Sequence, residues 1–120
     1  MIVGIVGSRT ITGSPRDERC RAIVYYAMLM LDEKDIIMSG GCKDGADYWA
    51  KNWAHRLGRR YIEAQVNPML KFSRAAAERN RTIVRVSDKI LAVWDGKSPG
   101  TKIVIESANF TQKPLWVTQL

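Results

Sequence analysis

The alternation of short apolar runs with longer segments of helical spacing most constrains how this chain can fold. Five apolar runs predict strands, at residues 2–6, 36–38, 60–66, 89–94 and 114–118. Four segments between them predict helices, at residues 15–31, 46–57, 69–87 and 101–111. This alternation predicts an α/β fold with a doubly wound, mostly parallel five-stranded sheet in the order 3-2-1-4-5 and helices on both faces.

Length and composition limit the class of protein. The chain has 120 residues, a hydrophobic content of 46% and no repeat or linker, which predicts one ordered domain over residues 1–120. Its longest apolar run, residues 22–31, is about half as long as a membrane span. An apolar strand, rather than a basic leader, opens the chain. We therefore expect a cytoplasmic protein with no membrane partner.

Cysteine and histidine do not suggest a metal site. Cys20, Cys42 and His55 lack the spacing of metal ligands. We expect both thiols to be reduced. Cys20 should lie on the core-facing side of a helix and Cys42 beside a glycine loop. The sequence predicts neither a metal nor a cofactor.

A glycine pair separates the second predicted strand from the helix that follows it, within residues 35–47. Gly40 and Gly41 lack side chains, so their N–H groups can approach a ligand closely, and the helix points its positive end at the same place. Such a loop suits a phosphate group. An ordinary strand-to-helix turn, in which Asp44 caps the helix and Asp47 complements its dipole, explains the same residues. The stretch alone leaves both interpretations open.

Two further loops of similar character follow the first and fourth predicted strands, at residues 7–9 and 96–101. Because ligands bind beyond the carboxyl ends of parallel strands, all three loops are expected at one edge of the sheet. The third predicted helix adds Arg79, whose guanidinium could grip a phosphate with a charge-assisted fork. Asn80 beside it either bonds nearby backbone or reaches the same ligand.

The predicted ligand-binding residues come from these loops and from the third helix. Amides and hydroxyls would bond phosphate or ribose, and two arginines would supply charge. No catalytic residue is assigned. The full set is Gly7, Ser8, Arg9, Ser39, Gly40, Gly41, Asp44, Asp47, Arg79, Asn80, Gly96, Ser98, Gly100 and Thr101.

Four motifs in this order resemble one superfamily. They are Val6-Gly7-Ser8-Arg9, Ser39-Gly40-Gly41 with Asp44-Gly45-Ala46-Asp47, Glu78-Arg79-Asn80-Arg81 with Ile83, and Ser98 with Gly100-Thr101. Together they resemble the SLOG superfamily, the Rossmann-like group that unites the DNA-processing A (SMF) proteins with the LOG nucleotide hydrolases, in a small stand-alone form. The resemblance covers most of the chain and implies a pocket for nucleotides or nucleotide-derived molecules.

The resemblance to the LOG enzymes fails at one catalytic position. Those enzymes hydrolyse the N-glycosidic bond of a nucleoside monophosphate with an arginine and the glutamate of a Pro-Gly-Gly-x-Gly-Thr-x-x-Glu motif. Arg79 fits the arginine, whereas Val104 stands where the glutamate is expected and the Pro-Gly-Gly opening is missing. Glu106 lies about 200° further round the helix. Asp44, Asp47 and Asp95 are the carboxylates that could replace it.

Three functions follow as alternatives. The first is binding of a nucleotide-derived small ligand by a sensor, carrier or sequestering module. The second is a LOG-like phosphoribohydrolase with an altered active site, so that enzymatic activity stays open. The third is a DNA-processing A-like binder of single-stranded nucleic acid, which the net charge of +7 favours. The basic residues are scattered, however, and we expect weak, salt-sensitive nucleic-acid binding. A homo-oligomer is plausible because members of the superfamily pair.

Overall fold

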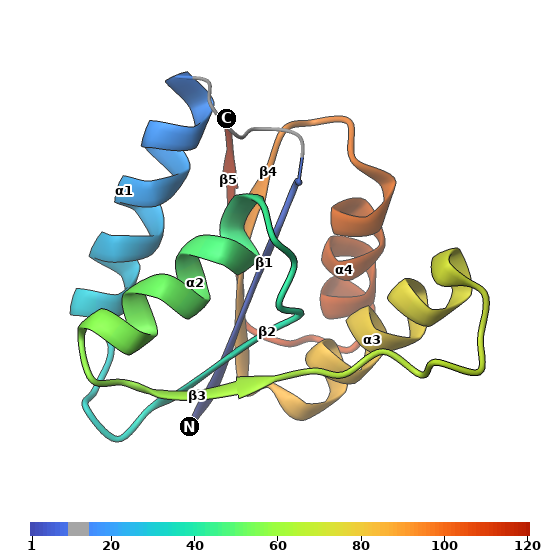
Figure 1. Cartoon of the computed structure of the whole chain (residues 1–120), viewed down its shortest axis with the longest axis horizontal. Coiled ribbons are helices and arrows are strands. Elements are labelled where there is room, and N and C mark those ends of the chain that lie inside the picture. Colours follow the sequence, from blue (N-terminus) through green and yellow to red (C-terminus); the bar gives the residue numbers. More distant parts are fainter. Residues whose placement is uncertain (10–14) are drawn as a thin grey trace.

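The computed structural model describes residues 1–9 and 15–120 and contains one five-stranded parallel sheet (Figure 1). The strands lie in the order β3-β2-β1-β4-β5, as the sequence predicts. Along the chain the elements are β1 (Ile2–Gly7), α1 (Pro15–Leu29), β2 (Ile36–Ser39), α2 (Gly45–Arg56), β3 (Arg60–Glu63), α3 (Phe72–Val86), β4 (Lys89–Trp94), α4 (Pro99–Phe110) and β5 (Leu115–Gln119). The sequence Ser14-Pro15-Arg16-Asp17 predicts Ser14 as the N-cap of the first helix, but Ser14 lies with residues 10–13 outside the described residues.

Helices cover both faces of the sheet, α1 and α2 on one side and α3 and α4 on the other (Figure 1). The central strand β1 is buried on both faces: Ile5 packs among residues from α1 and α2, and Val6 among residues from α3 and α4. Burial of such side chains stabilises the fold by about 1.5–3 kcal/mol each. Two-sided burial explains why β1 and β4 are apolar in the sequence apart from the glycines of β1 and Lys89 at the start of β4.

Helix α2 packs closely on the sheet because three alanines face it. Ala46, Ala50 and Ala54 are fully buried at a spacing of four residues. The helical spacing of Trp49 and Trp53 in the sequence predicts that both face the core, and in the structure both pack partly buried against the α1–α2 core. Their indole N–H groups donate to the Asp17 carboxylate (2.9 Å) and the Arg21 carbonyl (3.2 Å) of α1.

Several predicted boundaries were wrong by two or three residues. The strand expected up to residue 66 ends at Glu63, and the helix expected from residue 69 begins at Phe72. Between them, the Asn67 side chain accepts a hydrogen bond from the Met69 N–H (3.0 Å), which holds a turn in place of helix. The fourth helix begins at Pro99 rather than at residue 101, because proline fits the first helical position.

The structure agrees with the expectations for the two cysteines. Cys20 is fully buried in α1, Cys42 is half-buried beside the glycine loop, and both thiols are free. In the described ranges no group of three or more acidic, cysteine or histidine side chains could hold a metal ion. No helix among residues 1–9 and 15–120 has the length and apolar character to cross a membrane.

Two glycines with positive φ provide a matched test of how tightly α2 docks on the sheet. Gly45 (φ +74°) begins α2, and a Cβ there would collide with the Ser8 carbonyl oxygen. Gly58 (φ +66°) has open space around it. We expect Gly58→Ala to lower the free energy of unfolding by about 1–2 kcal/mol, the left-handed cost alone. Gly45→Ala should lose more than about 3 kcal/mol because the backbone contact adds to that cost.

Urea unfolding of both variants, followed by circular dichroism, measures the difference. Equal losses would show that the approach of α2 to Ser8 does not limit the fold.

Candidate functional site

A cavity of about 450 Å³ lies at the carboxyl ends of β1 and β4, between the sheet, α3 and α4. This volume falls within the range of small-molecule sites. The structure brings nine of the fourteen predicted site residues into its lining. These nine are Gly7, Ser8, Arg9, Asp47, Arg79, Asn80, Ser98, Gly100 and Thr101. The other five predicted residues do not line the cavity. They are Ser39, Gly40, Gly41, Asp44 and Gly96.

Arg79 forms the charged end of the cavity and has unused hydrogen-bonding capacity. Its Nη1 donates to the Gly40 carbonyl at 3.3 Å and its Nη2 to the Asn80 side-chain oxygen at 3.4 Å, both long bonds. Its Nε is buried and has no acceptor among the described residues. A guanidinium carries five N–H donors, so most of this group's capacity remains available to an anion.

The glycine pair makes room for side chains of neighbouring elements. A Cβ on Gly40 would come within 2.7 Å of Arg79 Nε and 2.8 Å of an Asp47 oxygen, so only glycine permits these two side chains to approach each other there. Gly41 (φ +70°) faces the side chain of Glu63 in the same manner. The predicted part of Gly40 in ligand binding would therefore be indirect, through the position of Arg79.

Two more of the predicted residues outside the lining, Ser39 and Gly96, contact side chains elsewhere in the fold. The Ser39 hydroxyl shares a hydrogen bond of 2.6 Å with the Tyr61 hydroxyl of β3. Gly96 (φ +84°) packs against the side chain of Gln119. Neither contact points to the cavity.

Asp47 is the buried carboxyl group of the site. It is 5% exposed and accepts a hydrogen bond from the Cys42 N–H (3.3 Å). Burial raises the pKa of Asp47, and the hydrogen bonds from Cys42 and the positive charge of Arg79 offset this only in part. Asp44 takes the N-cap position of α2, but its side chain makes no capping bond to the described backbone. The alternative interpretation of this stretch, in which the Asp44 side chain caps the helix, is therefore not supported.

The loop before α4 is held by Asp95. Its carboxylate accepts hydrogen bonds from the N–H groups of Lys97 (2.8 Å) and Ser98 (2.7 Å) and from the Ser98 hydroxyl (3.0 Å). The Ser8 hydroxyl accepts from the Asp95 N–H (3.0 Å), which joins the ends of β1 and β4. Because the Ser98 side chain is engaged with Asp95, it does not cap α4, and the helix begins at the cavity with Gly100 and Thr101 in its lining.

The apolar side of the cavity was missed by the sequence analysis. Phe72, Ala76 and Ala77 of α3 face Ile103 and Val104 of α4 across it. Phe72 is 71% exposed. A spacing of four and three residues from Phe72 through Ala76 to Arg79 places them on one side of the helix, and this spacing is visible in the sequence.

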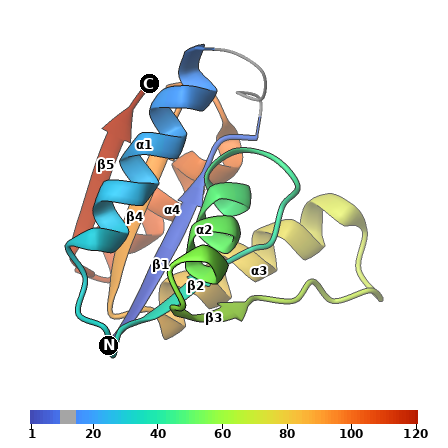
Figure 2. The ribbon, with the colours of Figure 1, turned by 60° about the vertical axis from the view of Figure 1, so that its left-hand side comes forward.

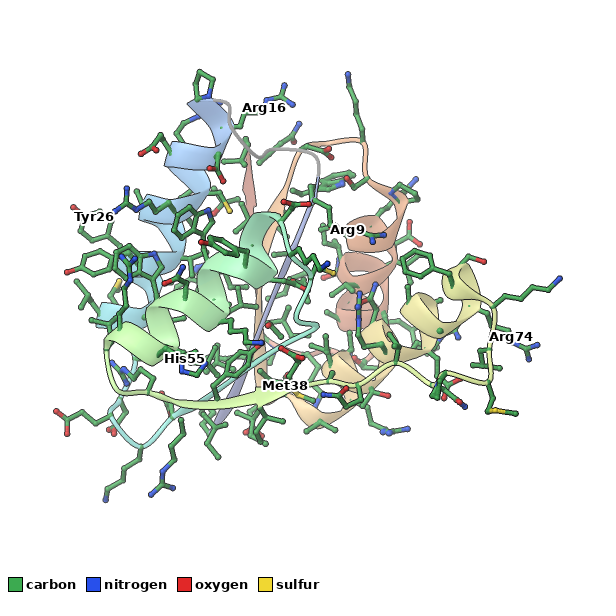
Figure 3. All side chains as sticks on the ribbon, in the orientation of Figure 1. Arg9, Arg16, Tyr26, Met38, His55 and Arg74 are labelled. Carbon is green, nitrogen blue, oxygen red and sulfur yellow. The ribbon has the colours of Figure 1, made fainter. Side chains whose placement is uncertain are left out.

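Arg9 also lines the cavity and contacts Phe72 of α3 at its mouth. Figure 3 shows it at the carboxyl end of β1, on the side where α3 and α4 lie. Its guanidinium carbon is 5.5 Å from the centre of the Phe72 ring, which is the geometry of a cation–π contact. The cavity thus has a charged inner end at Arg79 and an aromatic outer edge.

Solved structures with the same fold include three of different description. A structure named TM1055 superposes with a TM-score of 0.73 at 19% identity and covers 95% of this chain and 71% of that one. The molybdenum cofactor carrier protein of Chlamydomonas reinhardtii superposes with a TM-score of 0.72 at 19% identity and covers 97% of this chain and 74% of that one. DNA processing protein A of Helicobacter pylori superposes with a TM-score of 0.68 at 18% identity and covers 96% of this chain and 64% of that one. This chain shares a Rossmann-like α/β fold with all three.

The fold shared with these structures agrees with the Rossmann-like fold that the resemblance of the four motifs implies. At identities below 20%, the likeness concerns the fold alone. No protein-family model and no curated protein matches the sequence. Any ligand of the cavity in this chain must therefore be inferred from the residues of the chain itself.

Asp47→Asn is expected to stabilise the protein at neutral pH. Because the pKa of Asp47 is raised above its usual 3.8, the carboxylate is less favourable in the folded chain than in the unfolded one. This loss is absent well below pH 3.8, grows as the pH rises from 3.8 to the raised pKa, and is constant above it. Asparagine keeps an acceptor for the Cys42 N–H without the charge. The advantage of the variant in urea unfolding should therefore grow from pH 4 to pH 8; a constant difference would contradict the burial argument.

Proposed function

We propose that this protein binds a nucleotide-derived small molecule, with an anionic group at Arg79 and a planar ring along Phe72. The observation that carries the proposal is the guanidinium of Arg79, whose Nε is buried beside the cavity without an acceptor among the described residues. A buried donor left unsatisfied costs about 1–3 kcal/mol, and more when it is charged. If the side chain shifts so that a phosphate oxygen reaches the guanidinium, charge-assisted hydrogen bonds would remove this cost.

The surroundings of Arg79 favour an anion as well. The first turn of α4, with Gly100 and Thr101, presents the positive end of a helix at the same cavity. The Ser98 side chain does not cap these amides because it bonds Asp95. A ligand phosphate could therefore be bonded by backbone amides and a guanidinium together.

The apolar side of the cavity supports a ligand that carries a ring. Phe72 offers an exposed aromatic face next to small alanines, which leave space for a flat group between α3 and α4. Stacking on an aromatic residue is worth about 1–3 kcal/mol per base. A phosphate at one end and a heteroaromatic ring at the other are the features of a nucleotide or of a nucleotide-like cofactor.

The similar structures are consistent with two classes of ligand. One is named as a carrier of the molybdenum cofactor, and another as a protein with a single-stranded DNA binding mode. The contact of Arg9 with Phe72 narrows the mouth of the cavity in this chain, which favours a small molecule over a continuous strand. We therefore infer a binding or carrier role in the cytoplasm and only weak, salt-sensitive binding of nucleic acid.

Arg79→Ala should weaken binding of adenosine or guanosine monophosphate about tenfold to a hundredfold. This range corresponds to the loss of one or two charge-assisted hydrogen bonds. Isothermal titration calorimetry measures the affinity, and Arg81→Ala is the matched control because Arg81 is exposed on the same helix and does not line the cavity. Phe72→Ala should weaken the nucleotide but leave inorganic phosphate unaffected.

For the wild-type chain, a nucleotide at 100 times its dissociation constant should add about 2.7 kcal/mol to the free energy of unfolding. An absence of binding by all common nucleotides at millimolar concentration would refute the proposal. Equal weakening by Arg81→Ala would remove Arg79 from the site. Submicromolar binding of a single-stranded oligonucleotide at physiological salt, lost in Arg79→Ala, would identify nucleic acid as the ligand instead.

The second candidate, a phosphoribohydrolase, rests on Asp47, a buried carboxyl of raised pKa in the cavity lining. Against it, Val104 occupies the glutamate position and is 1% exposed, while Glu106 is exposed and lies 3.9 Å from Lys102 on the outer side of α4. Asp95 is occupied with its own loop.

We therefore expect no release of free base during long incubation with nucleoside monophosphates, as measured by chromatography. Base release that disappears in Asp47→Asn, while a stable fold is retained, would establish the hydrolase and give Asp47 a catalytic role.

A further inference from the structure

The outer edge of β5 is open and carries no charge. Strand β5 is the last in the sheet, with β4 on one side, and no strand of the described residues pairs with its other side (Figure 2). Its sequence is Leu-Trp-Val-Thr-Gln, and residues 114–120 contain no charged side chain. Trp116 is 63% exposed and Val117 is 44% exposed. An apolar, uncharged edge of this kind pairs readily with another strand.

The opposite edge of the sheet is built differently. Strand β3 has four residues, of which Arg60 and Glu63 are charged. Charged side chains and short length are the usual means by which edge strands avoid pairing. Of the two edges, then, β3 is protected against another chain and β5 is not.

The hydrogen bonds between β4 and β5 determine which backbone groups of β5 face outward. The Pro114 carbonyl accepts from the Ile90 N–H (2.9 Å), and the Leu120 N–H donates to the Trp94 carbonyl (2.8 Å). Backbone groups alternate in direction along a strand, so the even-numbered residues of β5 bond β4. The N–H and C=O groups of Leu115, Val117 and Gln119 therefore point away from the sheet.

We propose that the β5 edges of two copies of this chain pair in antiparallel fashion about a twofold axis at Val117. In this register Val117 faces Val117 of the second copy, and Leu115 faces Gln119. Each outward N–H then meets an outward C=O, because residues 115, 117 and 119 pair only with one another. The edge is thus complementary to itself, as a twofold interface requires.

The side chains agree with the same register. Trp116 pairs with Leu91 in the sheet and so lies on the face covered by α1 and α2. Across the twofold axis it stands opposite Thr118, with the tryptophan of the second copy in the diagonal position, within reach of an aromatic ring. The absence of charge from residues 114–120 allows this contact although each copy has a net charge of +7.

Sedimentation velocity of the full chain tests the proposal. The wild type should sediment as a species of twice 13.6 kDa at about 100 µM and dissociate on dilution. Val117→Lys places like charges opposite each other and should give a monomer under the same conditions. Val117→Glu should do the same, and an equimolar mixture of the two variants should regain the dimer, because the register pairs position 117 with itself.

Two further variants separate edge pairing from other causes. Val117→Pro removes an outward N–H and no bond to β4, so it should give a folded monomer by circular dichroism. Ile62→Lys on the β3 edge, a position of similar exposure at 41%, should leave the dimer intact. A wild-type monomer at 100 µM, a dimer unaffected by Val117→Lys, or loss of the dimer in Ile62→Lys would each overturn the proposal.

Discussion

All five strands run in the same direction, and this constraint determines where everything else in the molecule lies. Parallel neighbours need a crossover between them, so a helix must follow each of the first four strands. The helices bury both faces of the central strands, and the strand-to-helix loops gather at the carboxyl edge. The same topology leaves the flanks of β3 and β5 without a neighbour. The cavity and the exposed edge are therefore two results of one arrangement.

At the cavity, the glycines determine how closely the surrounding elements can approach one another. Gly40 allows Arg79 to come from α3 and Asp47 from α2 to almost the same place. Gly45 allows α2 to begin against the carbonyl of Ser8. A methyl group at either position would push apart elements that the cavity needs close together. The glycines thus set the shape of the site, whereas its chemistry belongs to the charged and aromatic residues around them.

The sequence was sufficient for the topology because its signals are local. Apolar spacing identifies each strand and helix, and the handedness of the crossovers limits how they can be arranged. The loops at residues 7–9 and 96–101 and Arg79 followed from the same logic, since parallel strands end at one edge. The approach of Gly40 to Arg79 joins residues 39 positions apart, and no local pattern encodes it.

The apolar wall was missed for a similar reason. Phe72 fell inside a helix expected to start at residue 69 and was given no part in the predicted site. In the structure the Asn67 turn delays the helix, so that Phe72 begins it and stays exposed at the mouth. Because α3 starts three residues later than expected, Phe72 lies at its first position and lines the cavity.

The shared position of Arg79 and Asp47 has a consequence for proton balance. An anion that draws on the charge of Arg79 leaves less of it to favour the Asp47 carboxylate, and its own negative charge acts in the same direction. The pKa of Asp47, already raised by burial, should then rise further when the cavity is filled. Occupation of the cavity is thereby coupled to uptake of a proton from solvent. If the cavity binds an anion of fixed charge as proposed, the buried carboxyl would make that binding tighter as the pH falls.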